Sequence, residues 1–228
     1  MRTSSPGAVG DASPLRVAET FLSLQGESTW AGLPCFFIRL AGCNLDCRDC
    51  DTRAARDPGV GRDAAIADLV AAARASGVPL AEVTGGEPLA QAGTPALCRA
   101  LVAAGLTVLV ETNGSLPLGD LPPEAIRIMD VKSPSSGMAE RLRPANFAEL
   151  RPQDEVKFVL ADRADFDHAC RILREHRLAE RTGKLLFSPA WGRLDPAGLA
   201  AWILAERLPV RLQLQLHKIL WGPDCQGR

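Results

Sequence analysis

The chain has 228 residues, of which 46% are hydrophobic and 23% are charged, as is usual for a globular protein with a packed core. Lys and Arg total 26 and Asp and Glu total 27, so the net charge of −1 provides no overall positive field to attract nucleic acid or an anionic membrane. No apolar run of about 18 residues occurs, which argues against a transmembrane helix and predicts a cytoplasmic protein.

Residues 1–14 are rich in Ser, Gly, Ala and Pro and are expected to form a flexible leader before a single domain at 15–228. Beyond them, apolar runs of strand-like composition alternate with stretches of helical period, which predicts an α/β fold. The predicted strands are 35–40, 80–84, 106–111, 126–130, 155–160, 184–187 and 211–216. The predicted helices are 63–75, beginning with an Asp cap, 95–104, 164–175 and 196–206.

Polar motifs follow most of the predicted strands. Active sites of parallel α/β sheets form beyond the carboxyl ends of the strands, so these motifs are expected to converge on one face. Roughly six parallel strands with reduced helices favour a partial, open β/α barrel over a closed one of eight units. The motifs, in chain order, are AGCNLDCRDCDT, GGEP, TNG, VKSP, SPAWG and HK.

Three cysteines, Cys43, Cys47 and Cys50, lie within eight residues with C-x3-C-x2-C spacing. In a reducing compartment such a group indicates a metal or iron-sulfur centre rather than disulfides. Three ligands to a four-iron cube leave one iron free, whereas structural zinc requires a fourth protein ligand. Cys35 and His217 are the candidates for that zinc alternative, although neither has a characteristic zinc spacing to the triplet.

The triplet, on a loop after the first predicted barrel strand, resembles the hallmark of the radical S-adenosylmethionine superfamily. The resemblance implies a 4Fe-4S cluster that binds S-adenosylmethionine and releases a 5′-deoxyadenosyl radical from it. It implies cofactor contacts at Asp49, Cys50 and Asp51, with Asp49 where the superfamily usually has an aromatic residue.

Two further motifs fit the same cofactor. Gly86 and Glu87 belong to a Gly-Gly turn that resembles the second motif of the superfamily, in which glycines permit close backbone approach and a carboxylate can accept from the methionine ammonium. Glu111 and Asn113 follow a strand, where a ribose would lie. Taken alone, either motif is equally compatible with an ordinary turn.

A narrower resemblance involves SLQGE at 23–27, FIRLAGCNL at 37–45 and CDT at 50–52. VKSP at 131–134, FSP at 187–189 and QLHK at 215–218 agree with it. Together these segments resemble the 7-carboxy-7-deazaguanine synthase family, over residues from about 17 to 223. The resemblance implies a radical lyase that converts 6-carboxy-5,6,7,8-tetrahydropterin to 7-carboxy-7-deazaguanine with loss of ammonia, in queuosine-type 7-deazapurine biosynthesis.

The family resemblance also implies roles for individual residues. Arg39 offers a planar fork to a carboxylate, and Gln25 and Glu27 can meet the donors and acceptors of a pterin edge. Thr52 is expected to hold Mg²⁺; without the resemblance it is more simply a turn residue. The full set of implied substrate contacts is Leu24, Gln25, Gly26, Glu27, Arg39, Thr84, His217 and Pro223. Further implied cofactor contacts are Ser133, Pro134, Ser135, Ser188, Pro189, Ala190 and Trp191.

His217 ends the last predicted strand, where a lone histidine is ordinarily a satisfied core residue. The family position favours a substrate contact instead. The resemblance further implies an external electron donor of the flavodoxin or ferredoxin type and a homodimer. Two rival classes share the triplet: a radical activating enzyme acting on a protein, and a zinc-stabilised binding module.

Overall fold

The computed structural model describes residues 14–223 and Gly227. The predicted leader at 1–14 lies outside this part except for Pro14, and so does the tail that continues beyond Pro223 except for Gly227. In the described part, one sheet contains nine strands in the order β3-β1-β2-β4-β5-β6-β7-β8-β9. The strands are β1 Leu15–Leu24, β2 Pro34–Leu40, β3 Arg62–Ala64, β4 Leu80–Gly85, β5 Thr107–Thr112, β6 Ile126–Asp130, β7 Glu155–Leu160, β8 Leu185–Pro189 and β9 Arg211–Leu212.

The sheet is parallel from β2 through β9, and β1 and β3 extend it on one side with antiparallel pairing. The predicted α/β fold and the open, partial β/α barrel are therefore confirmed, with seven parallel strands among the described residues. Because β1 turns back along β2, its carboxyl end lies away from the carboxyl ends of the parallel strands, and the loop after it must return towards them.

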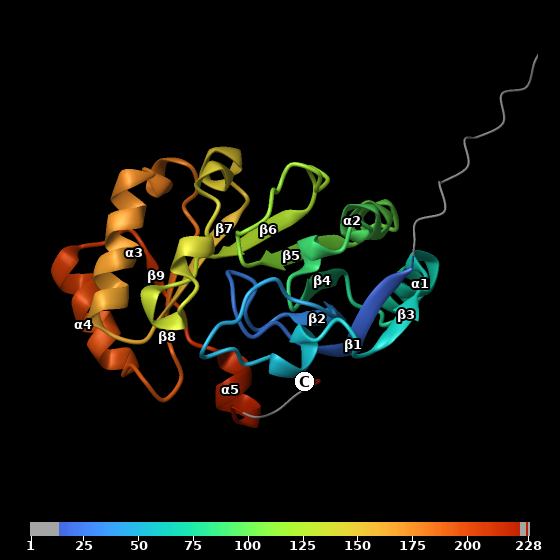
Figure 1. The fold of residues 1–228 in the computed structure, drawn as a ribbon, viewed down its shortest axis with the longest axis horizontal. Helices are drawn as coiled ribbons and strands as arrows, with labels where there is room; N and C mark the ends of the chain where they lie inside the picture. The colour runs from blue at the N-terminus through green and yellow to red at the C-terminus, as the bar shows by residue number, and fades with distance from the viewer. Residues whose placement is uncertain (1–13, 224–226, 228) are drawn as a thin grey trace, which may run out of the picture.

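Helices cover the outer face of the curved sheet (Figure 1). They are α1 Ile66–Ala75, α2 Thr94–Ala103, α3 Arg163–Glu175 and α4 Pro196–Glu206. The shorter α5 Leu216–Trp221 lies at the cavity instead. Short 3-10 helices are η1 Arg53–Arg56, η2 Pro88–Ala90, η3 Pro134–Ser136, η4 Ala139–Arg141, η5 Pro144–Glu149 and η6 Leu178–Glu180. No helix in the described ranges is long and apolar enough to cross a membrane.

Two apolar layers join these helices to the sheet. Leu97 and Leu101 of α2 pack with Ile38 and Val83 of the strands, and Phe166 of α3 packs with Phe187 of β8 in the other layer. Side chains along a strand alternate between its two faces. The strand residues next to those that pack against the helices therefore lie on the inner face of the sheet. That face is apolar near the strand beginnings, at Cys35, Phe37, Leu80, Leu109 and Ile128, and polar near their carboxyl ends.

The predicted strand 211–216 is wrong beyond its first two residues. Strand β9 ends at Leu212, and residues from Leu216 onward form α5. Leu212 and Leu214 are each 40% exposed, whereas Gln213 and Gln215 are buried. The alternation is real, but the polar side chains point inward, so the segment lacks the apolar face that would hold a longer strand against the sheet.

The first predicted helix also begins later than expected. Asp63 pairs with Arg16 in β3, and α1 begins at Ile66 after Ala65, which offers no side-chain cap. The remaining predicted helices, and the predicted strands up to 184–187, agree with the structure to within about two residues at each end. Strands β1 and β3 were not predicted.

Candidate active site

A cavity of about 470 Å³ opens at the carboxyl ends of the parallel strands. The motifs after β2, β4, β5 and β6 reach it, as does α5. Among the predicted site residues, those that line it are Leu24, Gln25, Gly26, Glu27, Arg39, Cys43, Cys47, Asp49, Cys50, Asp51, Thr52, Thr84, Gly86, Glu111, Asn113, Ser135, Ala190, Trp191, His217 and Pro223. The expected convergence of the loops is thus observed.

The three cysteines of the triplet are free thiols that line one wall of this cavity and are half-buried. The Leu45 amide donates to Cys43 Sγ at 3.5 Å, and the Asn113 side-chain amide lies 3.9 Å from the same sulfur. Burial raises the pKa of Cys43 and of Cys47. These N–H donors suit a thiolate that ligates a metal centre.

The spacing of the sulfurs separates an iron-sulfur cluster from a single zinc ion. Zinc bonds sulfur at about 2.3 Å, so all its thiolates lie within about 4 Å of one another. In the described part of the chain, only Glu27, Asp51 and His217 bring three potential ligand atoms within 4.8 Å, and the cysteine triplet is wider. Cys35 is fully buried among Phe37, Leu80 and Leu109, away from the cavity. The residues present therefore fit a multi-iron cluster and not the zinc alternative.

The Gly-Gly turn after β4 lies against the cysteine loop. A Cβ at Gly86 would come within 2.2 Å of the Gly42 carbonyl oxygen, so only glycine permits this approach. Glu87 points away from the cavity and is fully buried. Its carboxylate accepts hydrogen bonds from the Thr112 hydroxyl and from the amides of Leu89 and Asn113. Glu87 thereby joins the GGEP turn after β4 to the TNG turn after β5.

Four other predicted cofactor residues also lie behind the cavity wall: Ser133, Pro134, Ser188 and Pro189. The Ser133 hydroxyl donates to the Val159 carbonyl at 2.7 Å. Ser135, which does line the cavity, donates its amide and its hydroxyl to the buried carboxylate of Asp165 in α3. The turn at 133–135 is thus anchored from behind by the sheet and by α3.

Asp49, at the position before the third cysteine, is exposed and forms an ion pair with Arg193 after β8. The pair joins the cysteine loop to the turn that carries Trp191. Trp191 lines the cavity and is 47% exposed. An aromatic surface is therefore present at the cavity rim even though the cysteine loop itself has none before Cys50.

Arg39 also lines the cavity, beside Thr84 of β4, its register partner. Its Nε donates to Glu19 of β1 at 2.7 Å, and its guanidinium lies over the ring of Phe21. Phe21 stacks on Phe37 with 4.9 Å between ring centroids. These contacts hold the planar fork in place and turn its terminal nitrogens to a cavity that can accept a carboxylate.

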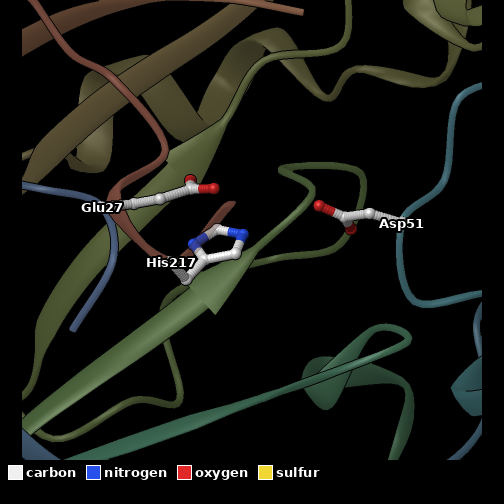
Figure 2. Close-up of side chains that lie close together, drawn as sticks. All are labelled: Glu27, Asp51 and His217. Atoms are coloured by element: carbon white, nitrogen blue, oxygen red, sulfur yellow. The ribbon is translucent and has the colours of Figure 1, made fainter. Parts of the chain in front are cut away.

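The loop after β1 supplies Gln25, Gly26 and Glu27, and α5 closes over it. The Leu216 amide donates to the Gly26 carbonyl at 2.9 Å, which brings His217 onto Gly26. Glu27, Asp51 and His217 point towards one another from three segments far apart in the sequence (Figure 2). His217 lies in α5 rather than at a strand end, and its ring faces the cavity instead of the core.

The two carboxylates of this trio already have cationic partners. Lys157 of β7 forms an ion pair with Glu27, and Lys218 of α5 lies 3.2 Å from Asp51. Burial alone would raise the pKa of Glu27, but the charge and hydrogen bond of Lys157 and a hydrogen bond from Gln215 lower it to about 2. Burial lowers the pKa of His217. The trio is therefore a polar cradle with an ionised carboxylate and a neutral imidazole.

Several cavity residues were not predicted. The polar ones are Glu19, Arg56, Thr112, Asp130, Lys132, Ser136, Lys157, Gln215 and Lys218. The segment EVKFVL, at β7, places Glu155 and Lys157 alternately with Val156, Phe158 and Leu160, and this alternation was the signal for a strand with one polar face. The corresponding signal for Glu19 was hidden because β1 itself was not predicted.

Comparison with known proteins agrees with this geometry. The model of the radical SAM superfamily matches residues 37–131. A protein of Chlorobaculum tepidum named 7-carboxy-7-deazaguanine synthase is 44% identical over 218 residues, covering 94% of this chain and 98% of that protein. The chain belongs to the 7-carboxy-7-deazaguanine synthase family. A second family member, from Koribacter versatilis, is 40% identical and is covered over its whole length by 93% of this chain.

Membership of this radical S-adenosylmethionine family implies a 4Fe-4S cluster and S-adenosylmethionine as cofactors, and confirms the resemblance expected from the motifs. Among solved structures, QueE from Escherichia coli matches with a TM-score of 0.74 at 20% identity, covering 90% of this chain and 95% of that one. SuiB from Streptococcus suis bound to S-adenosylmethionine matches with a TM-score of 0.53 over 76% of this chain. Both likenesses support the partial barrel.

Proposed function

We propose that this chain converts 6-carboxy-5,6,7,8-tetrahydropterin to 7-carboxy-7-deazaguanine with loss of ammonia, as a radical lyase of queuosine-type biosynthesis. One observation carries the proposal: the cysteine triplet and the polar set of Gln25, Glu27 and Arg39 line the same cavity. A radical formed at the cysteine wall would then arise beside a bound pterin. A protein substrate, as in the radical activating rival, has no need of this small polar set.

For the cofactors, Cys43, Cys47 and Cys50 would hold the 4Fe-4S cluster. When bound, the cluster and S-adenosylmethionine supply the radical that removes a hydrogen atom from the substrate. The cavity wall at Asp49, Asp51, Gly86, Glu111, Asn113, Ser135, Ala190 and Trp191 would contact S-adenosylmethionine. Glu87, Ser133, Pro134, Ser188 and Pro189 would support that wall from behind.

For the substrate, Arg39 would bind the carboxylate, and the ionised Glu27 would accept from the N–H edge of the pterin ring. The neutral His217 and the side chain of Gln25 would complete the polar contacts, with Leu24, Gly26, Thr84 and Pro223 forming the adjoining walls. Held in this way, the ring is fixed against the cysteine wall and water is displaced.

Thr52 would contribute its hydroxyl to Mg²⁺, a hard cation that keeps several waters and takes further oxygens from a substrate carboxylate. The hydroxyl of Thr52 lies 3.9 Å from Cys50 Sγ and lines the cavity, which supports a cation between the cluster wall and the substrate wall. Such a cation would add a second hold on the carboxylate that Arg39 binds.

We further propose a cytoplasmic homodimer of single catalytic domains at 15–228, reduced by an external donor of the flavodoxin or ferredoxin type. The reduction is required because the cluster must receive one electron for each activation of S-adenosylmethionine. Exposed apolar side chains near the last strand support a subunit contact; they are Leu212, Leu214, Ile219 and Leu220.

The test is anaerobic incubation of the reconstituted protein with S-adenosylmethionine, a reductant, Mg²⁺ and 6-carboxytetrahydropterin, followed by mass analysis. We expect 7-carboxy-7-deazaguanine, and we expect its yield to fall when Mg²⁺ is removed. Cleavage of S-adenosylmethionine without this product would retain the superfamily and reject the substrate.

Cysteine variants make the cluster assignment testable in the same preparation. Alanine at Cys43, Cys47 or Cys50 should reduce bound iron and labile sulfide to near background. Cys98, fully buried beside Leu97 and Leu101, provides the matched control. Cys98→Ala should retain both, and equal loss in all four variants would reject the assignment.

A further inference from the structure

Lys157 lies at the centre of a charged group on the cavity floor that the proposed chemistry does not explain. Its side chain is 3% exposed, and its ammonium contacts Glu27 and Glu111 directly and Asp130 at 3.7 Å. Strand register creates the group: Asp130 of β6 is paired with Lys157 of β7, and Glu111 of β5 with Ile128, two residues before Asp130. All three side chains therefore share the inner face.

Burying an ammonium is costly unless carboxylates compensate for the lost hydration. Here burial would lower the pKa of Lys157, but Glu111, Glu27 and Asp130 together raise it well above its ordinary value. Burial raises the pKa of Glu111 in spite of Lys157. Of the two carboxylates in direct contact with Lys157, Glu27 is thus the one whose pKa is lowered.

Two donors fix the orientation of Glu27. Lys157 Nζ binds Oε2, and Gln215 Nε2 donates to Oε1 at 2.7 Å. Gln215 is itself tied to Lys218 of α5, whose Nζ donates to the Gln215 side-chain oxygen at 2.8 Å. A carboxylate held at both oxygens still has free acceptor sites, and Glu27 lines the cavity.

We propose that Lys157 is the positioning residue of the substrate site, which keeps Glu27 ionised and aimed at a heterocycle that presents adjacent N–H donors. The proposal rests on the proposed function for the identity of that heterocycle. Lys157 acts through Glu27 and needs no contact with the substrate.

The charged and titratable groups around Glu27 come from every element that surrounds the cavity. They are Arg39 of β2, Asp51 after β2, Glu82 of β4, Glu111 of β5, Asp130 of β6, Lys157 of β7, and His217 and Lys218 of α5. Burial and the nearby carboxylates raise the pKa of Glu82 well above its ordinary value. Lys157 is the cation in direct contact with Glu27.

The variant Lys157→Met removes the charge and keeps much of the side-chain volume. We expect the dissociation constant of 6-carboxytetrahydropterin to rise by about 10- to 100-fold, as loss of a charge-assisted hydrogen bond does. We also expect affinity to depend more steeply on pH than in the wild type, increasing as pH rises, because burial alone raises the pKa of Glu27. Lys157→Arg should keep the pH dependence of the wild type while weakening binding through its different shape.

A double-mutant cycle with Glu27→Gln separates positioning from general destabilisation. In the Glu27→Gln background, Lys157→Met should add less than about twofold to the dissociation constant, because the group that Lys157 positions is no longer a carboxylate. Lys184→Met is the matched control: Lys184 lies 3.9 Å from Glu155, outside the cavity, and its removal should leave pterin binding unchanged.

Each variant is compared at equal iron content and equal cofactor binding, measured with S-adenosylmethionine alone. The same penalty for Lys157→Met in both backgrounds, or a steeper pH dependence of affinity in Lys157→Arg than in the wild type, would overturn the proposal. If Lys157→Met does not load iron, the proposal is judged from the pH dependence of pterin affinity in Lys157→Arg. If the wild type cleaves S-adenosylmethionine but neither binds nor converts the pterin, the proposed function is contradicted but the Lys157–Glu27 coupling is not. The coupling is then measured without substrate, from the pH dependence of Glu27 ionisation followed by isotope-edited infrared spectroscopy.

Discussion

His217 rests directly on Gly26: a Cβ built at residue 26 would lie 2.2 Å from Nδ1 of the imidazole. The contact forces α5 and the loop after β1 to fit together without a side chain between them. Gly26→Ala must therefore displace His217, and the pterin KM is expected to rise about tenfold or more while iron content is retained. Steady-state kinetics would measure this.

Gly183→Ala is the control for that substitution because a Cβ at residue 183 would meet nothing within 4 Å. Its KM should equal the wild-type value. A Gly26→Ala enzyme with unchanged KM would show that His217 does not contact the substrate.

Arg39 should not tolerate replacement by lysine. A lysine side chain at this position would keep the positive charge but lose the planar fork, the Nε bond to Glu19 and the stacking over Phe21. We expect Arg39→Lys to lower kcat/KM for the pterin by about tenfold or more, with cofactor binding unchanged. Steady-state kinetics with the pterin, together with isothermal titration of each ligand separately, would check this, and equal weakening towards both ligands would contradict it.

The pH dependence of the reaction should report on His217. Burial lowers its pKa below the ordinary 6.5, so an unfolded chain takes up this proton at a higher pH than the folded one. Stability from the neutral imidazole is therefore complete above pH 6.5 and declines as the pH falls through the lowered pKa. Substrate affinity should decline over the same range.

The check is kcat/KM measured on both sides of the ordinary histidine pKa of 6.5 for wild type and for His217→Asn. The variant should lose the acidic decline. His168→Asn, in the outer helix α3, should keep it, because burial also lowers the pKa of His168 but that ring does not line the cavity.

Glu87 should behave as a structural link between motifs. In Glu87→Gln the amide would leave at least one of the donors from Thr112, Leu89 and Asn113 without its acceptor in a fully buried site. A cost of about 1 to 3 kcal/mol in unfolding free energy is expected. Thermal unfolding would detect it, and a large loss of S-adenosylmethionine affinity without loss of stability would favour direct contact instead.

The parallel part of the sheet could be predicted because its strands are buried on the outer face and read as apolar runs between helices. Strand β1 could not, because it is largely half-exposed and mixes polar with apolar residues, and β3 has three residues held only by pairing with β1. The strand predicted at 211–216 failed because alternation does not specify which set of side chains points inward.

The same limit applies to the site. Cys43, Cys47, Cys50 and Arg39 could be placed because each belongs to a motif adjoining a predicted strand. Lys157 could not be linked to Glu27, 130 residues away in sequence, because only strand register and the return of the loop after β1 bring the two together. The position of His217 likewise depends on α5, which is not among the predicted elements and begins where the predicted strand 211–216 ends.

The contact between Asp51 and Lys218 ties the residue after the third cysteine to the last helix at 3.2 Å. Loading of iron at Cys50 should therefore alter the local stability of α5. Amide hydrogen exchange in α5 should slow when the cluster is assembled, and Lys218→Met should abolish this response while leaving iron content intact. The C-terminal helix would then serve as a built-in reporter of cofactor assembly, readable before any substrate is added.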